Sequence, residues 1–167
     1  MKFLLMLLLT AFSLNSLASS HAEDLFIKKV YAVTEANNGR SEDVDPETLT
    51  SRQIDGLMKA ANAEADIWYD TILEGDYMLN SEAEVEVAAL SKYYSASGEF
   101  VAYRAIIQHA AYDVGSCDID WEEDQDKMDQ FLKGNCTPGY ISSGIFISPD
   151  FKFHFRDENA IEDFSEE

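Results

Sequence analysis

The chain has 167 residues, of which 46% are hydrophobic and 26% are charged, and its 32 acidic and 12 basic residues give a formal net charge of −20. This length and apolar content suit one globular domain. The acidic excess argues against nucleic acid as a partner, because contacts to phosphates require a net positive surface.

Residues 1–22 are typical of a secretory signal peptide. A basic residue precedes a long apolar run, and small residues then mark two cleavage positions, after Ala18 or, as we prefer, after Ala22. No later segment has the roughly 18 apolar residues that a membrane span requires. We therefore expect an exported protein, periplasmic or extracellular and bacterial, with a single α+β domain over 23–156 and an acidic, frayed tail over 157–167.

The first elements of the exported chain are expected to be a strand and a loop. Residues 25–33 (LFIKKVYAV) alternate well enough for a strand, although Phe26, Val30 and Val33 also fit helical spacing. Turn-forming and acidic residues without periodicity follow over 37–47, which predicts a loop.

A long amphipathic helix is predicted to begin at Thr50. Thr50 and Gln53 have the spacing of a capping box, and apolar residues then recur at helical intervals until Gly75 ends the helix. The opposite face of this helix is polar. It should therefore pack one apolar stripe onto a large flat surface such as a sheet.

Residues 84–114 have two interpretations that lead to different folds. As strands, they alternate on both sides of a turn at 95–98, and they are rich in Val, Ile and Tyr. As helices, they begin with a second capping box formed by Ser81 and Glu84 and contain many alanines. We expect strands, because the preceding helix needs a sheet to cover; the alternative fold is a mostly helical bundle with a C-terminal β-hairpin.

Cys117 and Cys136 are the only cysteines, and in an exported protein this predicts a disulfide. The segment between them begins with acidic residues and ends in a short helix that Gly134 closes. The fold should therefore carry a disulfide-closed acidic insertion.

The acidic insertion contains a candidate partner contact. An exposed Trp in a ring of carboxylates is typical of a protein interface, and the alternative is that Trp121 packs on the sheet. The candidate residues are Trp121, Glu122, Glu123 and Asp124. The alternating acids of 118–126 resemble half of a calcium loop, but Glu123 stands where that loop requires Gly, so we expect no metal site.

Two strands, 140–147 and 151–156, should form a hairpin about a turn of Ser, Pro and Asp. The second strand alternates aromatic with basic or titratable residues, which makes Lys152, His154 and Arg156 a candidate basic strip. The main interpretation is a solvated face that neutralises nearby carboxylates. The alternative is a contact with an anionic ligand or a partner.

The sequence contains no catalytic motif. It has no nucleophile elbow and no reactive-cysteine motif, and His109 stands among alanines and isoleucines, as a core histidine would. An enzyme would require His109 to lie with carboxylates in a cleft. We therefore expect no enzyme, no catalytic residue and no cofactor.

The expected order of elements is strand, helix, two strands, a disulfide-closed insertion and two strands, which is similar to the cystatin-like arrangement. This resemblance implies one long helix packed on a curled antiparallel sheet. Residues 65–77 (ADIWYDTILEGDY) are also similar to the opening of NTF2-like domains, which implies a ligand-sized cone between helix and sheet. Inhibitory cystatins carry Gln-x-Val-x-Gly in the first hairpin. Residues 94–99 read YSASGE instead, so inhibition of thiol proteases is not implied.

The function expected from these patterns is that of a small exported acidic binding module, without catalytic activity, for a protein or an amphipathic ligand. The alternative is an inhibitor or immunity protein against a cationic exported hydrolase, such as a muramidase. The net charge does not decide between these two functions, because an acidic surface can also simply keep a protein solvated. The sequence leaves the oligomeric state open as well.

Overall fold

The structure is a computed structural model that describes residues 20–36, 39–72, 77–80, 83–117, 128–157, 160 and 163–166. The strands are β1 (Arg40–Asp43), β2 (Tyr77–Leu79), β3 (Glu86–Tyr94), β4 (Phe100–Asp113), β5 (Thr137–Ile147), β6 (His154–Arg156) and β7 (Asp163–Glu166). The helices are an N-terminal helix over 20–35, α2 (Ser51–Ile72) and α3 (Met128–Asn135), with short 3-10 turns η1 (Pro46–Thr48) and η2 (Val114–Ser116).

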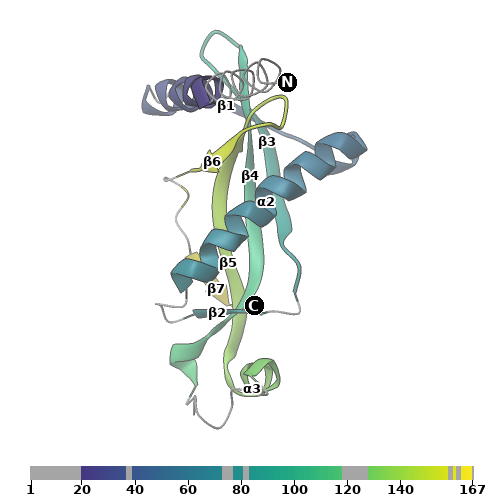
Figure 1. Cartoon of the computed structure of the whole chain (residues 1–167), viewed down its shortest axis with the longest axis vertical. Coiled ribbons are helices and arrows are strands. Elements are labelled where there is room, and N and C mark those ends of the chain that lie inside the picture. Colours follow the sequence, from purple (N-terminus) through teal and green to yellow (C-terminus); the bar gives the residue numbers. More distant parts are fainter. Residues whose placement is uncertain are drawn as a thin grey trace, which may run out of the picture.

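These elements form an α+β fold with one antiparallel sheet, as expected. Its strands follow the order β1-β3-β4-β5-β6, while β2 pairs with the far end of β4 and β7 with the far end of β5. Figure 1 shows α2 lying diagonally across the sheet, the N-terminal helix at one end of it and α3 at the other.

Residues 84–114 are confirmed as strands, and the helical-bundle alternative is wrong. β3 and β4 pair from Glu86↔Gln108 to Tyr94↔Phe100, across a turn that Gly98 closes with a φ of 82°. The side chains of β4 alternate between two covered faces of the sheet, which a period of two provides and a helical period does not.

The capping box at the start of α2 is confirmed. The Thr50 amide donates to Gln53 Oε1 at 2.9 Å, and the Gln53 amide donates to Thr50 Oγ1 at 3.4 Å. The apolar stripe of α2 then packs on one face of the sheet. The buried core on this face includes Leu57, Ala61, Ala65, Leu90, Ala105, Ile107, Ile145 and Ile147.

The strand predicted over 25–33 is wrong, because this segment belongs to the N-terminal helix. Phe26, Val30 and Val33 lie on one side of that helix and pack against the second face of the sheet, where Phe146 lies. The segment is helical because an amphipathic helix buries its apolar side against this face of the sheet. The fold therefore has two helices on opposite faces of the sheet where one was expected.

The loop predicted over 37–47 contains the edge strand β1. It pairs with β3 from Arg40↔Tyr94 to Asp43↔Ser91, and all four of its residues are exposed. A charged edge strand buries no side chain, so it leaves no apolar alternation in the sequence. β7 lies within 157–167, the segment expected to form a frayed tail, and pairs there with β5.

The disulfide between Cys117 and Cys136 is confirmed, with 4.9 Å between the two Cα atoms. It ties the end of η2 to the residue that follows α3, and α3 is the short helix that the sequence predicts. Cys136 and Leu132 are buried against Tyr112 of β4, which anchors the insertion to the sheet.

The turn between β5 and β6 packs closely against α2. Phe151 has a φ of 58°, which is rare for a residue other than glycine, and its ring lies 4.7 Å from that of Tyr103. A Cβ at Gly56 of α2 would lie 2.7 Å from Phe151 Cβ. Glycine at this position therefore lets the strained turn approach the helix.

Two ion pairs hold the end of β6. Arg156 Nε lies 2.5 Å from Glu64 Oε1 of α2, and Glu64 is 2% exposed. The next residue, Asp157, is also buried, and its Oδ2 lies 2.7 Å from Arg104 Nε of β4. Successive residues thus form ion pairs on opposite faces of the sheet.

Substitutions in the N-terminal helix should distinguish a helix from a strand. Phe26→Ala should lower the free energy of unfolding by about 3 kcal/mol, because Phe26 is buried, whereas Leu25→Ala should change it by less than about 0.5 kcal/mol, because Leu25 is 54% exposed. Urea unfolding of both variants measures this. A larger loss for Leu25→Ala than for Phe26→Ala would contradict the helix.

Removal of the disulfide should destabilise the fold. Cys117→Ser with Cys136→Ser should lower the free energy of unfolding by about 2 to 4 kcal/mol, because the bond closes a loop between residues 19 apart. Reduction of the wild-type protein should give the same loss. Two free thiols in the mass of the unreduced exported protein would contradict the pairing.

Candidate functional site

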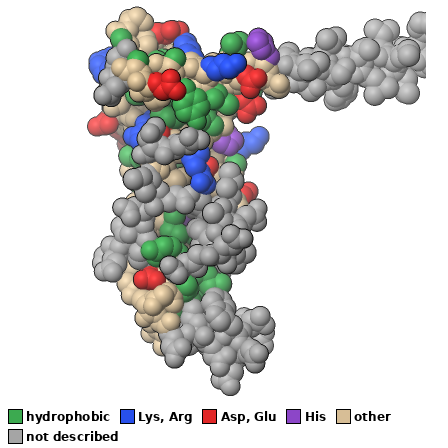
Figure 2. All heavy atoms as spheres, turned by 90° about the vertical axis from the view of Figure 1, so that its left-hand side faces the viewer, with side chains coloured by type: hydrophobic (Ala, Val, Ile, Leu, Met, Phe, Trp, Pro, Cys, Tyr) green, Lys and Arg blue, Asp and Glu red, His purple; other side chains and the backbone are tan. Residues whose placement is uncertain are grey.

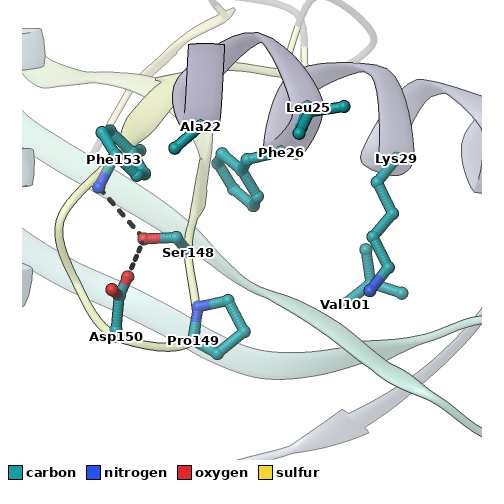
Figure 3. Close-up of a pocket in the computed structure, with 9 residues that line it drawn as sticks. All are labelled: Ala22, Leu25, Phe26, Lys29, Val101, Ser148, Pro149, Asp150 and Phe153. Carbon is teal, nitrogen blue, oxygen red and sulfur yellow. Dashed lines mark hydrogen bonds between the residues drawn. The ribbon is translucent and has the colours of Figure 1, made fainter. Parts of the chain in front are cut away.

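A groove of about 270 Å³ lies where the turn between β5 and β6 meets the N-terminal helix (Figure 3). Its apolar lining consists of Ala22, Leu25, Phe26, Val101, Pro149 and Phe153. Its polar lining consists of Lys29, Ser148 and Asp150. The groove therefore joins three segments that are distant in the sequence.

The turn that forms one wall of the groove is held by the side chain of Ser148. Its Oγ accepts a hydrogen bond from the Phe153 amide at 3.0 Å and donates one to Asp150 Oδ1 at 2.8 Å (Figure 3), and it also accepts one from the Lys152 amide at 3.1 Å. Ser148 is buried, so these bonds replace those it would make to water. This wall is consequently held by its own hydrogen bonds.

The charged residues at the groove are paired. Lys29 Nζ lies 2.6 Å from Glu99 Oε1, and Lys152 Nζ lies 2.8 Å from Asp150 Oδ2. Partial burial raises the pKa of Asp150, but hydrogen bonds from Lys152 and Ser148 lower it by more, so the carboxyl has a pKa below its ordinary value. Asp150 is therefore a carboxylate near neutral pH, and the rim of the groove carries balanced charge around an apolar lining.

A second hollow, of about 410 Å³, lies on the other side of the same turn. The first turns of α2 line it with Arg52, Gln53 and Gly56, and the hairpin turn lines it from Pro149 to Lys152. Pro149 and Asp150 border both hollows. The tip of the hairpin thus projects between two concave surfaces at one end of the sheet.

His109 lies in a third hollow, a cleft of about 410 Å³ beneath α2. It is buried, as expected of a core histidine, and its Nδ1 lies 2.8 Å from the carbonyl oxygen of Ala110. The cleft also contains the carboxylates of Asp66 and Glu84. Among the described residues, His109 and two acidic residues thus line one cleft, which is the arrangement that the enzyme interpretation requires.

The candidate basic strip is largely neutralised by carboxylates. Lys152 pairs with the exposed Asp150, whereas Arg156 pairs with the buried Glu64 of α2. His154 is half-buried on β6 opposite Ile147. Arg156, whose side chain is 32% exposed, therefore links β6 to α2 through a buried carboxylate.

The candidate partner contact, which consists of Trp121, Glu122, Glu123 and Asp124, lies outside the described residues. Of the insertion, the structure describes the disulfide and α3.

Sequence reasoning missed Glu64 and Gly56, which decide how α2 meets the sheet. Glu64 lies on the apolar stripe of α2, seven residues after Leu57, and a carboxylate in an apolar stripe is a detectable signal for a buried ion pair. Its partner Arg156 lies 92 residues away in the sequence, so spacing alone could not identify it.

Within the described ranges, no group of three or more His, Cys, Asp and Glu side chains could hold a metal ion. No helix of this part of the chain is both long and apolar enough to cross a membrane.

No protein-family model matches this chain, and neither a curated protein nor a solved structure resembles it significantly.

Proposed function

We propose that this protein is a small exported binding module, without catalytic activity, that holds a protein partner on the groove between the N-terminal helix and the β5–β6 turn. The observation that carries the proposal is an apolar groove against a hydrogen-bonded turn, with Leu25 54% exposed beside the buried Phe26. Large apolar side chains at a concave surface mark sites of binding. Figure 2 shows hydrophobic side chains among charged ones at the upper end of the molecule, the end that carries the N-terminal helix in Figure 1.

The groove has room for one large apolar side chain of the partner. A cavity of about 150 Å³ holds a benzene molecule, so about 270 Å³ accommodates an aromatic ring with its stem. Binding energy at interfaces concentrates in such anchors. A partner that inserts one aromatic side chain here would also contact the hairpin tip.

The net charge of −20 supports a basic partner. An acidic protein attracts cationic surfaces over a distance of about 10 Å at 0.1 M salt, and this attraction raises the rate of association. The rim of the groove carries balanced charge, so its apolar lining supplies the affinity. Electrostatic steering and anchoring thus come from different parts of the surface.

Export supports the same proposal. The chain begins with the features of a signal peptide, and its two cysteines form a disulfide, which persists in the periplasm or outside the cell. Cleavage after Ala22 would leave Leu25, Phe26 and Lys29, and with them most of the helix side of the groove.

We propose the cystatin-like order for the sheet as well. Support for it comes from the strand path β1-β3-β4-β5-β6, with α2 between β1 and β3 along the chain and the disulfide-closed insertion between β4 and β5. In this proposal the first strand is β1. The N-terminal helix, β2 and β7 are additions to that order.

A second candidate function is an inhibitor or immunity protein against a cationic exported hydrolase. The net charge of −20 favours it, because hydrolases that act on anionic cell-wall polymers carry basic surfaces. The hairpin tip, with a hollow on each side, would be the element presented to the enzyme.

The anchor role of the groove is testable with a lysine-rich peptide that carries one central Trp. We expect this peptide to bind, and Leu25→Ser to weaken binding about three- to tenfold, because contact with one large apolar side chain is lost. Ile54→Ser is the matched control, since Ile54 is the other large apolar side chain that is exposed among the described residues, and it lies outside the groove. Fluorescence titration of the Trp measures both.

A second peptide and a salt series distinguish affinity that comes from the Trp side chain from affinity that comes from charge. The same peptide with Gly in place of Trp should bind at least about tenfold more weakly, and binding of both should weaken as salt rises to about 0.2 M. Equal binding of the two peptides, or equal losses in Leu25→Ser and Ile54→Ser, would contradict the groove as an anchor. Inhibition of a basic muramidase by the wild-type protein would favour the second candidate.

A further inference from the structure

Gly56 of α2 lies directly against the hairpin turn that borders the groove. A Cβ at this position would lie 2.7 Å from Phe151 Cβ and 3.2 Å from Phe151 Cγ. The shorter distance is well below van der Waals contact, and Phe151 Cβ is bonded to the backbone, so rotation of the side chain would not relieve it. A larger residue at position 56 therefore requires the backbone of the helix or of the turn to move.

The helix is held more firmly than the turn. Leu57 and Ala61 of α2 are buried in the core, and Glu64 is tied to β6 by its ion pair. Because packed cores resist displacement, α2 should keep its place on the sheet. The tip of the turn is exposed at Pro149 and Asp150. The turn is therefore the part that should yield.

A displacement of the turn would reach the groove. The Ser148 hydroxyl ties the turn together through its hydrogen bonds to Asp150 and to the Phe153 amide, so its residues should move as one unit. Pro149 and Asp150 border the hollow beside α2 on one side and the groove on the other. Figure 3 shows them across the groove from Phe26 of the N-terminal helix. Movement of the turn away from α2 should consequently narrow the groove.

We propose that Gly56, which lies outside the groove, determines the size of the side chain that the groove accepts. This inference rests on the proposed function and adds the specificity of the same site. With glycine at position 56 the groove holds a large aromatic anchor, and with alanine it would hold only a smaller aliphatic one. Overfilling a packed apolar site is unfavourable, so a narrowed groove should lose affinity for Trp more than for Leu. Gly56 is thus a positioning residue that acts through Phe151.

Two lysine-rich peptides that are identical except for a central Trp or a central Leu measure this specificity. In calorimetric titrations the wild-type protein should bind the Trp peptide about three- to tenfold more tightly than the Leu peptide. Gly56→Ala should weaken binding of the Trp peptide at least about tenfold and binding of the Leu peptide less than about threefold. Alanine is favourable within a helix, so the variant should fold. Partial unfolding would weaken both peptides equally, so the ratio of the two affinities separates specificity from stability.

Gly134→Ala in α3 is the matched control, because it makes the same chemical change where a Cβ meets no atom within 4 Å. It should leave both affinities within about twofold of the wild-type values. Phe151→Gly provides the second control, since it removes the Cβ that Gly56 accommodates and tolerates the φ of 58°. In this background Gly56→Ala should no longer change the ratio of the two affinities.

The outcomes separate this inference from the proposed function. An unchanged ratio in Gly56→Ala, or the same change of ratio with and without Phe151→Gly, would overturn the role of Gly56 and leave the groove as a binding site. Failure of the wild-type protein to bind either peptide would overturn both this role and the proposed function.

Discussion

Arg156 and Asp157 place two ion pairs on opposite faces of the sheet, and the rest of the architecture depends on them. Glu64 and Asp157 are 2% and 4% exposed, and a buried carboxylate is costly unless it is paired and hydrogen-bonded. Glu64 also accepts a hydrogen bond from Ser143 Oγ at 3.3 Å, and the Asp157 amide donates to the Gly144 carbonyl at 2.8 Å. Each carboxylate therefore faces a guanidinium group, and each of the two residues makes a further hydrogen bond.

These pairs determine where β6 lies and therefore where both candidate sites lie. The Arg156 pair fixes α2 against the sheet above the His109 cleft, and the Asp157 pair fixes the end of β6 against β4. The turn before β6 is held by Ser148 and by Phe151 against Gly56. This turn borders the groove, so the contacts that hold α2 to the sheet also set the shape of the groove.

The sequence predicted the elements whose determinants are local. The capping box of Thr50 and Gln53 begins α2, the alternation of β4 is that of a strand covered on both faces, and the cysteine pair forms the disulfide. The sequence of 25–33 fits both a strand and a helix. It is a helix in the fold because its apolar side packs on the second face of the sheet. β1 buries no side chain, so its sequence lacks the apolar alternation that would identify a strand. The groove and the cleft were beyond prediction because each joins segments that are distant in the sequence and meet only in the folded protein.

A double-mutant cycle on Glu64 and Arg156 tests the central claim most directly. Glu64→Gln and Arg156→Met should each lower the free energy of unfolding by about 2 to 4 kcal/mol, somewhat less than for a fully buried pair because 32% of the Arg156 side chain is exposed. The double variant should lose at least about 1.5 kcal/mol less than the sum of the two, because neither group is then left buried without its partner. Losses that simply add would contradict the claim that this ion pair holds α2 to the sheet.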